Sequence, residues 1–365
     1  MLNKLILVGG FLGSGKTTLL AEAAKRLAQQ EKTVGLITND QAPELVDTRL
    51  LASVGNGTNN KVAELSGSCF CCNFNGFVDS VKYLIGQGAE TIIAEPVGSC
   101  TDLSATILNP LKKTYPDWPL APLSVLVDSG RLQEIFGKTE SGVEADALYI
   151  MERQLAEADR IYISKSDQLS ETQRKECKTL LEEKYPNTKV GFLSSKNGEG
   201  LDDWLAEVQS AVDAGKTIVP VDYDRYAHGE AVLGWLNATA TVLGGDSDGG
   251  NKLLFDLLSD MHAELKTKGL EVGHVKALLS MGGKEWVGNL TSLNGGINIS
   301  EINHSESAMP SEHALLILNA RVQTQPETLE RLVRDILGQF DMSITSLRCL
   351  MPGRPVPTHR YNDCI

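Results

Sequence analysis

The feature that most constrains this chain is a glycine-rich stretch near its N-terminus, residues 10–17, which reads GFLGSGKT. It satisfies the pattern G-x-x-x-x-G-K-[ST] of a phosphate-binding loop. An apolar run at 5–8 precedes it, and apolar residues recur at helical spacing over 19–27. A strand, a glycine loop and a helix in this order direct backbone N–H groups and the helix N-terminus at phosphate oxygens. The stretch predicts a nucleotide site, with Lys16 on the β- and γ-phosphates and Thr17 on Mg²⁺.

The composition excludes several other classes of protein. Of the 365 residues, 42% are hydrophobic and 22% are charged, as in ordinary globular chains. No apolar run approaches the ~20 residues of a membrane helix, and the first residues lack the pattern of a signal peptide. The formal net charge of −13 disfavours a non-specific partnership with nucleic acid or a membrane surface. We therefore expect a cytoplasmic protein with no nucleic-acid and no membrane partner.

Strand-like and helix-like segments alternate over residues 1–215, which we expect to form one domain. The alternation predicts an α/β fold, a mostly parallel sheet of the P-loop type with flanking helices. The expected strands cover 5–8, 33–38, 91–95, 123–128, 160–164 and 189–194. The expected helices cover 16–30, 75–86, 143–158, 170–184 and 201–213. Segments 42–60 and 99–122 show little periodicity, so we expect long loops there.

A second, smaller domain is expected over residues 229–365, after a linker at 216–228. Val275, Ala277 and Leu279 alternate with their neighbours, which is typical of a strand with one buried face. Further strands are expected at 231–242, 315–322 and 344–350, and helices at 253–265 and 324–337. The order β-α-β-β-α-β predicts a ferredoxin-like α+β sandwich.

A second nucleotide feature is the stretch SKSD at residues 164–167, at the end of an expected strand. It is similar to the N-K-x-D element that reads guanine. The Asp167 carboxylate would accept from guanine N1–H and the 2-amino group, while Lys165 would lie along the base. The loop at 193–201, with Ser195, is similar to the S-A-K loop that contacts the guanine oxygen. Two ordinary polar loops at strand ends remain the alternative.

Three cysteines, Cys69, Cys71 and Cys72, lie within four residues. Three thiols in this spacing can converge on one soft or borderline metal ion and leave a fourth position open, which suits transfer better than a structural site. The alternatives are a trio of buried cysteines that act as small apolar residues and a redox pair of Cys69 and Cys72. Cys100 could reach this stretch from its own loop, but we expect it to be a small core residue.

Four motifs follow one another in the order GFLGSGKTT, CFCC, EPVG and SKSD. In this order they resemble the CobW/HypB/UreG family of P-loop GTPases that deliver metals, whose members carry G-x-x-G-x-G-K-T, C-x-C-C, E-x-x-G and N-K-x-D. Residues 154–167 resemble a further stretch of the family, and the resemblance covers about residues 3–210. Three features differ from the family. Ser68 stands where many members have glycine, and Ser164 replaces the asparagine of N-K-x-D. The C-terminal part also lacks the histidine-rich stretch that many members carry.

The resemblance implies a role for each matched position. Lys16 and Glu95 would be catalytic, with Glu95 near Mg²⁺ or the attacking water. Asp40 would lie in switch I and Gly98 in switch II, the two segments that sense the γ-phosphate. A transition metal would bind at Cys69, Cys71 and Cys72, and Mg²⁺ at Thr17. The positions implied to contact GTP or GDP are Gly10, Gly13, Ser14, Gly15, Lys16, Thr17, Thr18, Asp40, Gly98, Lys165, Asp167 and Ser195.

The implied function is that of a GTP-hydrolysing metallochaperone with low intrinsic turnover. It would carry Zn²⁺ or Co²⁺ to a client metalloprotein or a cofactor-assembly protein, and the second domain would recognise the client or close over the metal site. Two alternatives remain from the residues alone. One is a nucleotide-dependent interaction switch in which the cysteines hold a structural zinc, and the other is a P-loop kinase of a small molecule.

Overall fold

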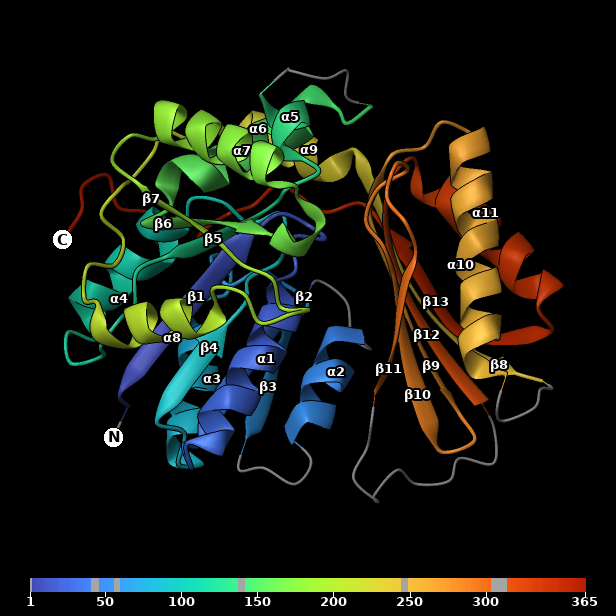
Figure 1. The fold of residues 1–365 in the computed structure, drawn as a ribbon, viewed down its shortest axis with the longest axis horizontal. Coiled ribbons are helices and arrows are strands. Elements are labelled where there is room, and N and C mark those ends of the chain that lie inside the picture. Colours follow the sequence, from blue (N-terminus) through green and yellow to red (C-terminus); the bar gives the residue numbers. More distant parts are fainter. Residues whose placement is uncertain (1, 41–45, 56–59, 137–141, 244–248, 303–313) are drawn as a thin grey trace.

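The computed structural model describes residues 2–40, 46–55, 60–136, 142–243, 249–302 and 314–365. Figure 1 shows two β-sheets that lie side by side, each with its own helices. Within the described ranges, no helix has both the length and the apolar character needed to cross a membrane.

The first sheet has seven parallel strands in the order β3-β2-β4-β1-β5-β6-β7. They are β1 (Lys4–Gly10), β2 (Val34–Asp40), β3 (Lys61–Ser66), β4 (Thr91–Ala94), β5 (Ser124–Asp128), β6 (Arg160–Ser164) and β7 (Lys189–Phe192). Leu5 and Leu7 of β1 belong to one apolar core, whereas Ile6 and Val8 belong to another. A strand that is buried on both faces is typical of a parallel sheet, so the predicted α/β class is confirmed.

Helices cover both faces of this sheet. They are α1 (Lys16–Gln29), α2 (Val46–Gly55), α3 (Phe74–Gly86), α4 (Asn109–Thr114), α5 (Leu132–Ile135), α6 (Ala145–Glu157), α7 (Glu171–Lys184) and α8 (Leu201–Ser210). The helices α1 and α8 pack in the core that contains Ile6, and α3 and α6 pack in the core that contains Leu5. Because all the strands are parallel, the loops that follow β1, β4, β6 and β7 meet at the carboxyl edge of the sheet.

Two segments differ from the long loops that the sequence predicts. Segment 42–60 contains α2, and β3 follows it directly, although residues 41–45 and 56–59 lie outside the described ranges. Segment 99–122 contains the π-helix η1 (Ser104–Leu108) and α4. The prolines in this segment led us to expect a loop rather than helices. Pro110 lies in the first turn of α4, where its missing N–H is tolerated.

The second sheet has six antiparallel strands in the order β11-β10-β9-β12-β8-β13. They are β8 (Leu233–Val242), β9 (Val272–Met281), β10 (Lys284–Leu290), β11 (Asn298–Ile302), β12 (Ala314–Gln323) and β13 (Met342–Leu350). The helices α10 (Gly250–Thr267) and α11 (Pro326–Gln339) cover the face that is turned away from the first sheet, and α2 lies against the other face (Figure 1).

The predicted ferredoxin-like order is confirmed for four strands and two helices, which run β8-α10-β9-β12-α11-β13. The strands β10 and β11 extend the sheet beyond β9 and were not predicted. β11 lies at the edge and has the sequence NISEI, with only two apolar residues, so it carries almost no strand signal of its own. This extension matters for function, because β9, β10 and β11 face the phosphate-binding loop.

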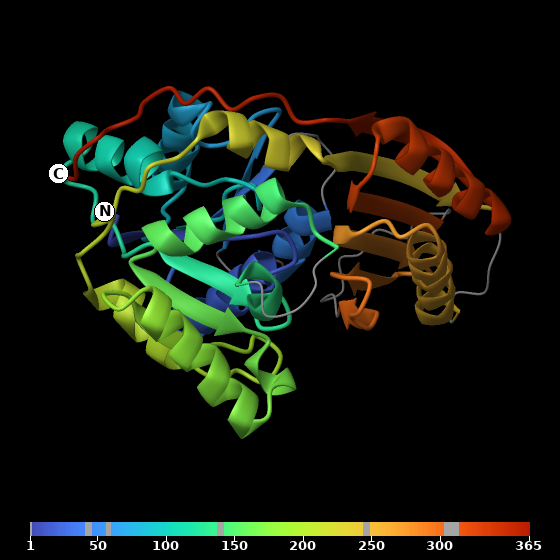
Figure 2. The same cartoon turned by 90° about the horizontal axis from the view of Figure 1, so that it is seen from above.

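The chain crosses between the two sheets twice. Helix α9 (Tyr223–Ala231) occupies part of the segment expected as a linker and lies beside α6. After β13, residues 351–365 return along the first unit as an extended tail, which Figure 2 shows in red. The N–H groups of Thr358 and Tyr361 donate to the carbonyls of Cys71 and Ala105, at 2.8 and 3.0 Å. The tail therefore belongs spatially with the first unit and lies across the cysteine stretch.

Candidate nucleotide and metal sites

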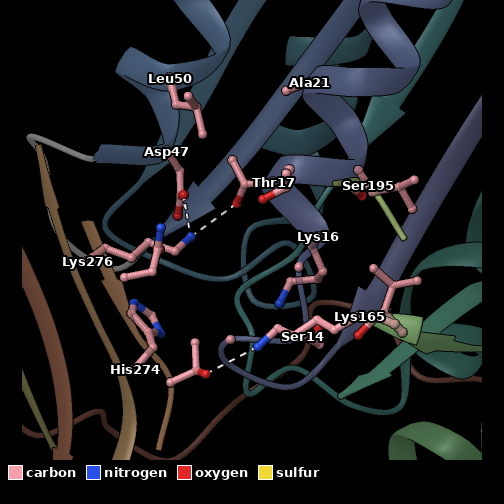
Figure 3. A pocket seen from close by; sticks show the side chains of 18 of the residues that line it. Ser14, Lys16, Thr17, Ala21, Asp47, Leu50, Lys165, Ser195, His274 and Lys276 are labelled. Carbon is pink, nitrogen blue, oxygen red and sulfur yellow. Dashed lines mark hydrogen bonds and ion pairs between the residues drawn. The ribbon is translucent and has the colours of Figure 1, made fainter. Parts of the chain in front are cut away.

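A cavity of about 900 Å³ opens at the carboxyl edge of the first sheet. Its walls come from the glycine loop, from the loops after β4, β6 and β7, and from β9, β10 and β11 of the second sheet. Figure 3 shows side chains from both units pointing into it. The volume and the convergence of polar groups are those of a small-molecule site.

The glycine loop has a backbone that needs its glycines. Gly10 and Gly15 have φ of 129° and 92°, in the region that side chains disfavour. A Cβ at Gly10 would lie 2.3 Å from the carbonyl oxygen of Leu126. The loop leads directly into α1, so the N–H groups of the first helical turn point at the cavity.

Lys16 lies buried at the base of this loop. Its Nζ donates to the carbonyl oxygens of Gly10 and Phe11, at 2.7 and 3.2 Å. Desolvation lowers the pKa of Lys16 to about 8, while the nearby Glu95 carboxylate opposes this shift. An anionic ligand in the cavity would favour the charged form of the lysine.

Thr17 and Glu95 form the floor of the same end of the cavity. The Thr17 hydroxyl donates to Glu95 Oε1 at 3.1 Å. Burial raises the pKa of Glu95 to about 7, and the charge of Asp47 adds to the shift. Glu95 Oε2 and Ser14 Oγ are buried and have no hydrogen-bond partner among the described residues. Unpartnered oxygens beside a cradle of N–H groups fit a phosphate with its Mg²⁺ ion.

The other end of the cavity holds the residues expected to read guanine. Asp167 Oδ1 accepts from the Ser194 hydroxyl at 2.6 Å, which fixes the carboxylate. Lys165 Nζ donates to Asp128 Oδ2 at 2.5 Å and to Thr291 Oγ1 at 3.2 Å. Ser164 Oγ donates to the Val127 carbonyl at 3.1 Å, so its hydroxyl is used inside the protein.

Most of the residues that the sequence singled out lie together in this cavity. Those that line it are Gly13, Ser14, Gly15, Lys16, Thr17, Thr18, Glu95, Gly98, Lys165, Asp167 and Ser195. Gly10 lies behind the loop, and a Cβ at Gly98 would approach Leu12 Cδ2 to 2.7 Å, so Gly98 packs against the loop. Asp40 is the last residue of β2, and its side chain lies outside what the structure describes.

Among the cavity residues that were not assigned to the site from the sequence are Asp47, His274 and Lys276. Lys276 Nζ donates to Asp47 Oδ1 at 2.5 Å and to Thr17 Oγ1 at 3.3 Å (Figure 3). His274 is buried, its Nδ1 has no partner among the described residues, and desolvation holds its pKa well below the usual range. A single lysine or histidine in an alternating strand gives no local signal of function.

The three cysteines of the CFCC stretch form a cluster. The Sγ atoms of Cys69 and Cys71 are 3.1 Å apart, and those of Cys71 and Cys72 are 3.8 Å apart. All three lie within 4.8 Å of one another, a spacing that can hold one metal ion. The Cys100 thiol, expected to be a core residue that could reach this stretch, is buried beside the cluster, where it shifts the pKa values of Cys69 and Cys71.

The cysteine stretch lies next to both segments that flank the nucleotide cavity. Asn39, in β2 at the start of the expected switch I, donates through Nδ2 to the carbonyls of Leu65 and Ser68, at 2.8 and 2.7 Å. Its Oδ1 accepts from the Phe70 N–H at 2.9 Å. On the other side, Gln154 Nε2 donates to the carbonyls of Gly98 and Cys100, at 3.0 and 2.8 Å, which holds the backbone of the segment that carries the Cys100 thiol.

Two further elements enclose the cysteines. Glu230 of α9 accepts through Oε1 from Ser99 Oγ at 2.5 Å, while its buried Oε2 has no partner in the described chain. Desolvation raises the pKa of Glu230 to about 8. From the C-terminal tail, the Val356 N–H donates to Cys72 Sγ at 3.3 Å. The tail and α9 thus lie at the cysteines, whereas the second sheet lies at the nucleotide cavity.

A glycine loop at the carboxyl edge of a parallel sheet, with Lys16 and Thr17 at one end of a cavity and Asp167 at the other, defines a P-loop nucleotide-binding protein. Residues 4–191, just over half of the chain, match the model of the CobW/HypB/UreG nucleotide-binding domain. The chain therefore belongs to the CobW/HypB/UreG family and is a GTPase of that family.

Several solved structures are similar in fold. The hydrogenase maturation factor HypB from Archaeoglobus fulgidus is 15% identical, with a TM-score of 0.40 over 57% of this chain and 90% of that chain. HypB from Helicobacter pylori in complex with nickel is 20% identical, with a TM-score of 0.40 over 56% and 84%. The Zn(II)-bound YjiA GTPase from E. coli is 14% identical, with a TM-score of 0.33 over 92% and 98%. Scores this low support no conclusion about function. No curated protein matches the chain.

Proposed function

We propose that this chain is a GTP-hydrolysing metallochaperone, which binds one transition-metal ion at Cys69, Cys71 and Cys72 and releases it to a client according to the nucleotide bound. The observation that carries the proposal is the hydrogen bonding of the cysteine stretch to Asn39 on one side, together with the Cys100 thiol, which lies beside the cluster in the segment after Glu95 on the other. A change in either segment moves groups that hold the thiols.

The hydrolytic half of the proposal uses the phosphate end of the cavity. Lys16 would exchange its carbonyl partners for phosphate oxygens, and Thr17 would hold Mg²⁺ through its hydroxyl. When bound, Mg²⁺ neutralises charge on the transferring phosphoryl group. The Glu95 carboxyl, whose pKa lies at about 7, is suited to orient a water or a water bound to the metal. Intrinsic turnover is expected to be low, because such switches depend on the correct placement of the attacking water.

The metal half of the proposal follows from the donor set. Thiolates are soft ligands that suit Zn²⁺ and also bind Co²⁺, and affinity alone does not choose between them. Hydrogen bonds from Cys100, Cys71 and Cys72 hold the pKa of the Cys69 thiol well below its usual range, so the cluster stabilises at least one thiolate. Three ligands from one short stretch, with Cys100 beside them, leave the site able to exchange its last ligand with a client.

Titration of the full chain with Co²⁺ tests this proposal, because thiolate ligation of Co²⁺ is visible as charge-transfer absorption. We expect one ion per chain, with thiolate ligation, and displacement by Zn²⁺. The titration is repeated with GDP and with a non-hydrolysable GTP analogue. An ion that stays equally bound in every nucleotide state would favour the alternative of an interaction switch with a structural zinc, and no binding at all would exclude both.

Guanine specificity gives a separate prediction, centred on Asp167. The native chain should bind GTP better than ATP, because the carboxylate accepts from two guanine donors and adenine lacks the matching pair. Asp167→Asn should erode this preference and improve binding of xanthosine triphosphate, whose 2-carbonyl accepts from the new amide. Competition against a fluorescent nucleotide measures all three affinities.

The matched control for this prediction is Asp202→Asn, at a side chain that is 83% exposed on α8 and pairs only on the surface with Arg26. It should leave the order of affinities unchanged. Equal affinity of the native chain for GTP and ATP would contradict the assignment of Asp167 and would point to Ser164 as the cause of relaxed base choice.

A further inference from the structure

The second sheet places a lysine inside the nucleotide cavity. Lys276 lies in β9, and its ammonium contacts Asp47 of α2 at 2.5 Å and the Thr17 hydroxyl at 3.3 Å. The side chains of Lys276 and Asp47 are 17% and 20% exposed, so the ion pair is largely shielded from solvent. Figure 3 shows the pair beside Thr17, with the lysine and the aspartate coming from different units.

The alternation of β9 explains why Lys276 points this way. Val275, Ala277 and Leu279 lie in the core under α10 and α11, so the residues between them face the first unit. His274, on the same face, lines the cavity with a buried Nδ1 that has no partner among the described residues. The sheet thus presents one cation and one unpartnered imidazole to the phosphate end of the site.

We propose that Lys276 is a phosphate-contacting residue of the GTPase site, supplied by the second unit of the same chain. On binding of a nucleoside triphosphate, its ammonium leaves Asp47 and pairs with the terminal phosphate, next to Mg²⁺ at Thr17. A cation supplied in this way stabilises the charge on the transferring phosphoryl group. The inference rests on the nucleotide half of the proposed function and is independent of the metal.

The move of Lys276 from Asp47 to the phosphate would also make the contacts between α2 and the second sheet depend on the bound nucleotide. Asp47 lies in the first turn of α2, which packs on the sheet through Val46 and Leu50 against Leu278. The Val46 N–H donates to Asn319 Oδ1 of β12 at 3.0 Å. Breaking the ion pair of Asp47 and Lys276 removes the polar contact beside this apolar one, so α2 and the second sheet are held together differently in the triphosphate state.

The test compares the affinities of the full chain for GDP and for a non-hydrolysable GTP analogue. Lys276→Ala should weaken binding of the analogue on the order of tenfold or more, because a charge-assisted hydrogen bond is lost. Binding of GDP should change far less, since the missing partner is the terminal phosphate. Lys276→Arg should restore part of the difference, and the rate of GTP hydrolysis should follow the same order.

Asp47→Asn should have the effect opposite to that of Lys276→Ala. It keeps the lysine and removes the carboxylate that competes with the phosphate for the ammonium. This variant should bind the GTP analogue more tightly than the native chain does. The control is Lys268→Ala, at a surface lysine of the same unit that is 47% exposed and pairs with Glu264. Equal losses for GDP and for the analogue in Lys276→Ala, or weaker analogue binding in Asp47→Asn, would show that the pair only fastens the two units together and would overturn the inference.

A native chain that binds neither nucleotide would overturn the proposed function as well. Metal stoichiometry at the cysteines should be the same in Lys276→Ala as in the native chain. The two proposals can therefore fail separately.

Discussion

Replacement of Lys16 by alanine is expected to reduce the rate of GTP hydrolysis by about 10²-fold or more while the fold is preserved. The lysine lies at the base of the glycine loop, where its ammonium is held by the carbonyls of Gly10 and Phe11. These contacts place the charge where phosphate oxygens would bind, and no other lysine of the first unit approaches the loop carbonyls among the contacts described. Phosphate release from the full chain at saturating GTP measures the effect.

A surface lysine of the same unit serves as the control for Lys16→Ala. Lys178 of α7 is 46% exposed and pairs with Glu182 one helical turn away, so Lys178→Ala should hydrolyse GTP at the native rate. Thermal unfolding of both variants shows whether the fold is kept. A folded Lys16→Ala variant with undiminished turnover would contradict the assignment of the phosphate-binding loop.

Simultaneous replacement of Cys69, Cys71 and Cys72 by serine is expected to abolish high-affinity metal binding and to leave GTP binding within a few-fold of the value of the metal-free native chain. Serine hydroxyls are poor ligands for Zn²⁺ and Co²⁺, which these thiolates suit. The cysteines do not line the nucleotide cavity, so the nucleotide should bind as before. Metal titration and nucleotide competition on the same sample measure both properties.

Cysteines outside the cluster supply the matched control. Cys349 lies in β13, and Cys364 lies exposed in the tail. Their double replacement by serine should leave metal stoichiometry unchanged. Persistent binding of one ion to the triple variant would mean that the metal is held elsewhere in the chain. Loss of GTP binding by a folded triple variant would contradict the separation of the two sites.

The sequence predicted those parts of the fold whose signals are local. The strands β1, β4, β5 and β6 are buried along nearly their whole length, and α1, α3, α6, α7 and α8 appear close to their expected ranges. The glycine loop, SKSD and the loop at 193–201 follow strands β1, β6 and β7, so parallel pairing alone brings them to one edge. This is why Lys16, Lys165 and Ser195 could be expected at one cavity before any coordinates existed.

Contacts between distant segments could not be predicted in this way. Lys276 reaches Thr17 from a strand of the other unit. Cys100, in the segment after β4, lies beside the cysteine stretch at 69–72. The tail at 351–365 forms hydrogen bonds with Cys71 and Cys72, and its sequence has no periodic pattern that would predict this contact. Each contact depends on tertiary packing, and single residues in ordinary strands or loops carry no sign of it.

The most direct test of the account is the metal affinity of the native chain measured with GDP, with a non-hydrolysable GTP analogue and without nucleotide. Asn39 is hydrogen-bonded to the cysteine stretch at the start of the expected switch I, and the Cys100 thiol lies beside the cluster in the segment after Glu95, so metal affinity should differ between the GDP and GTP states. Linkage requires the metal to shift nucleotide affinity by the same factor, expected to be on the order of 5- to 150-fold. Identical metal affinity in the two nucleotide states would contradict the account, because a nucleotide with no differential effect cannot drive release.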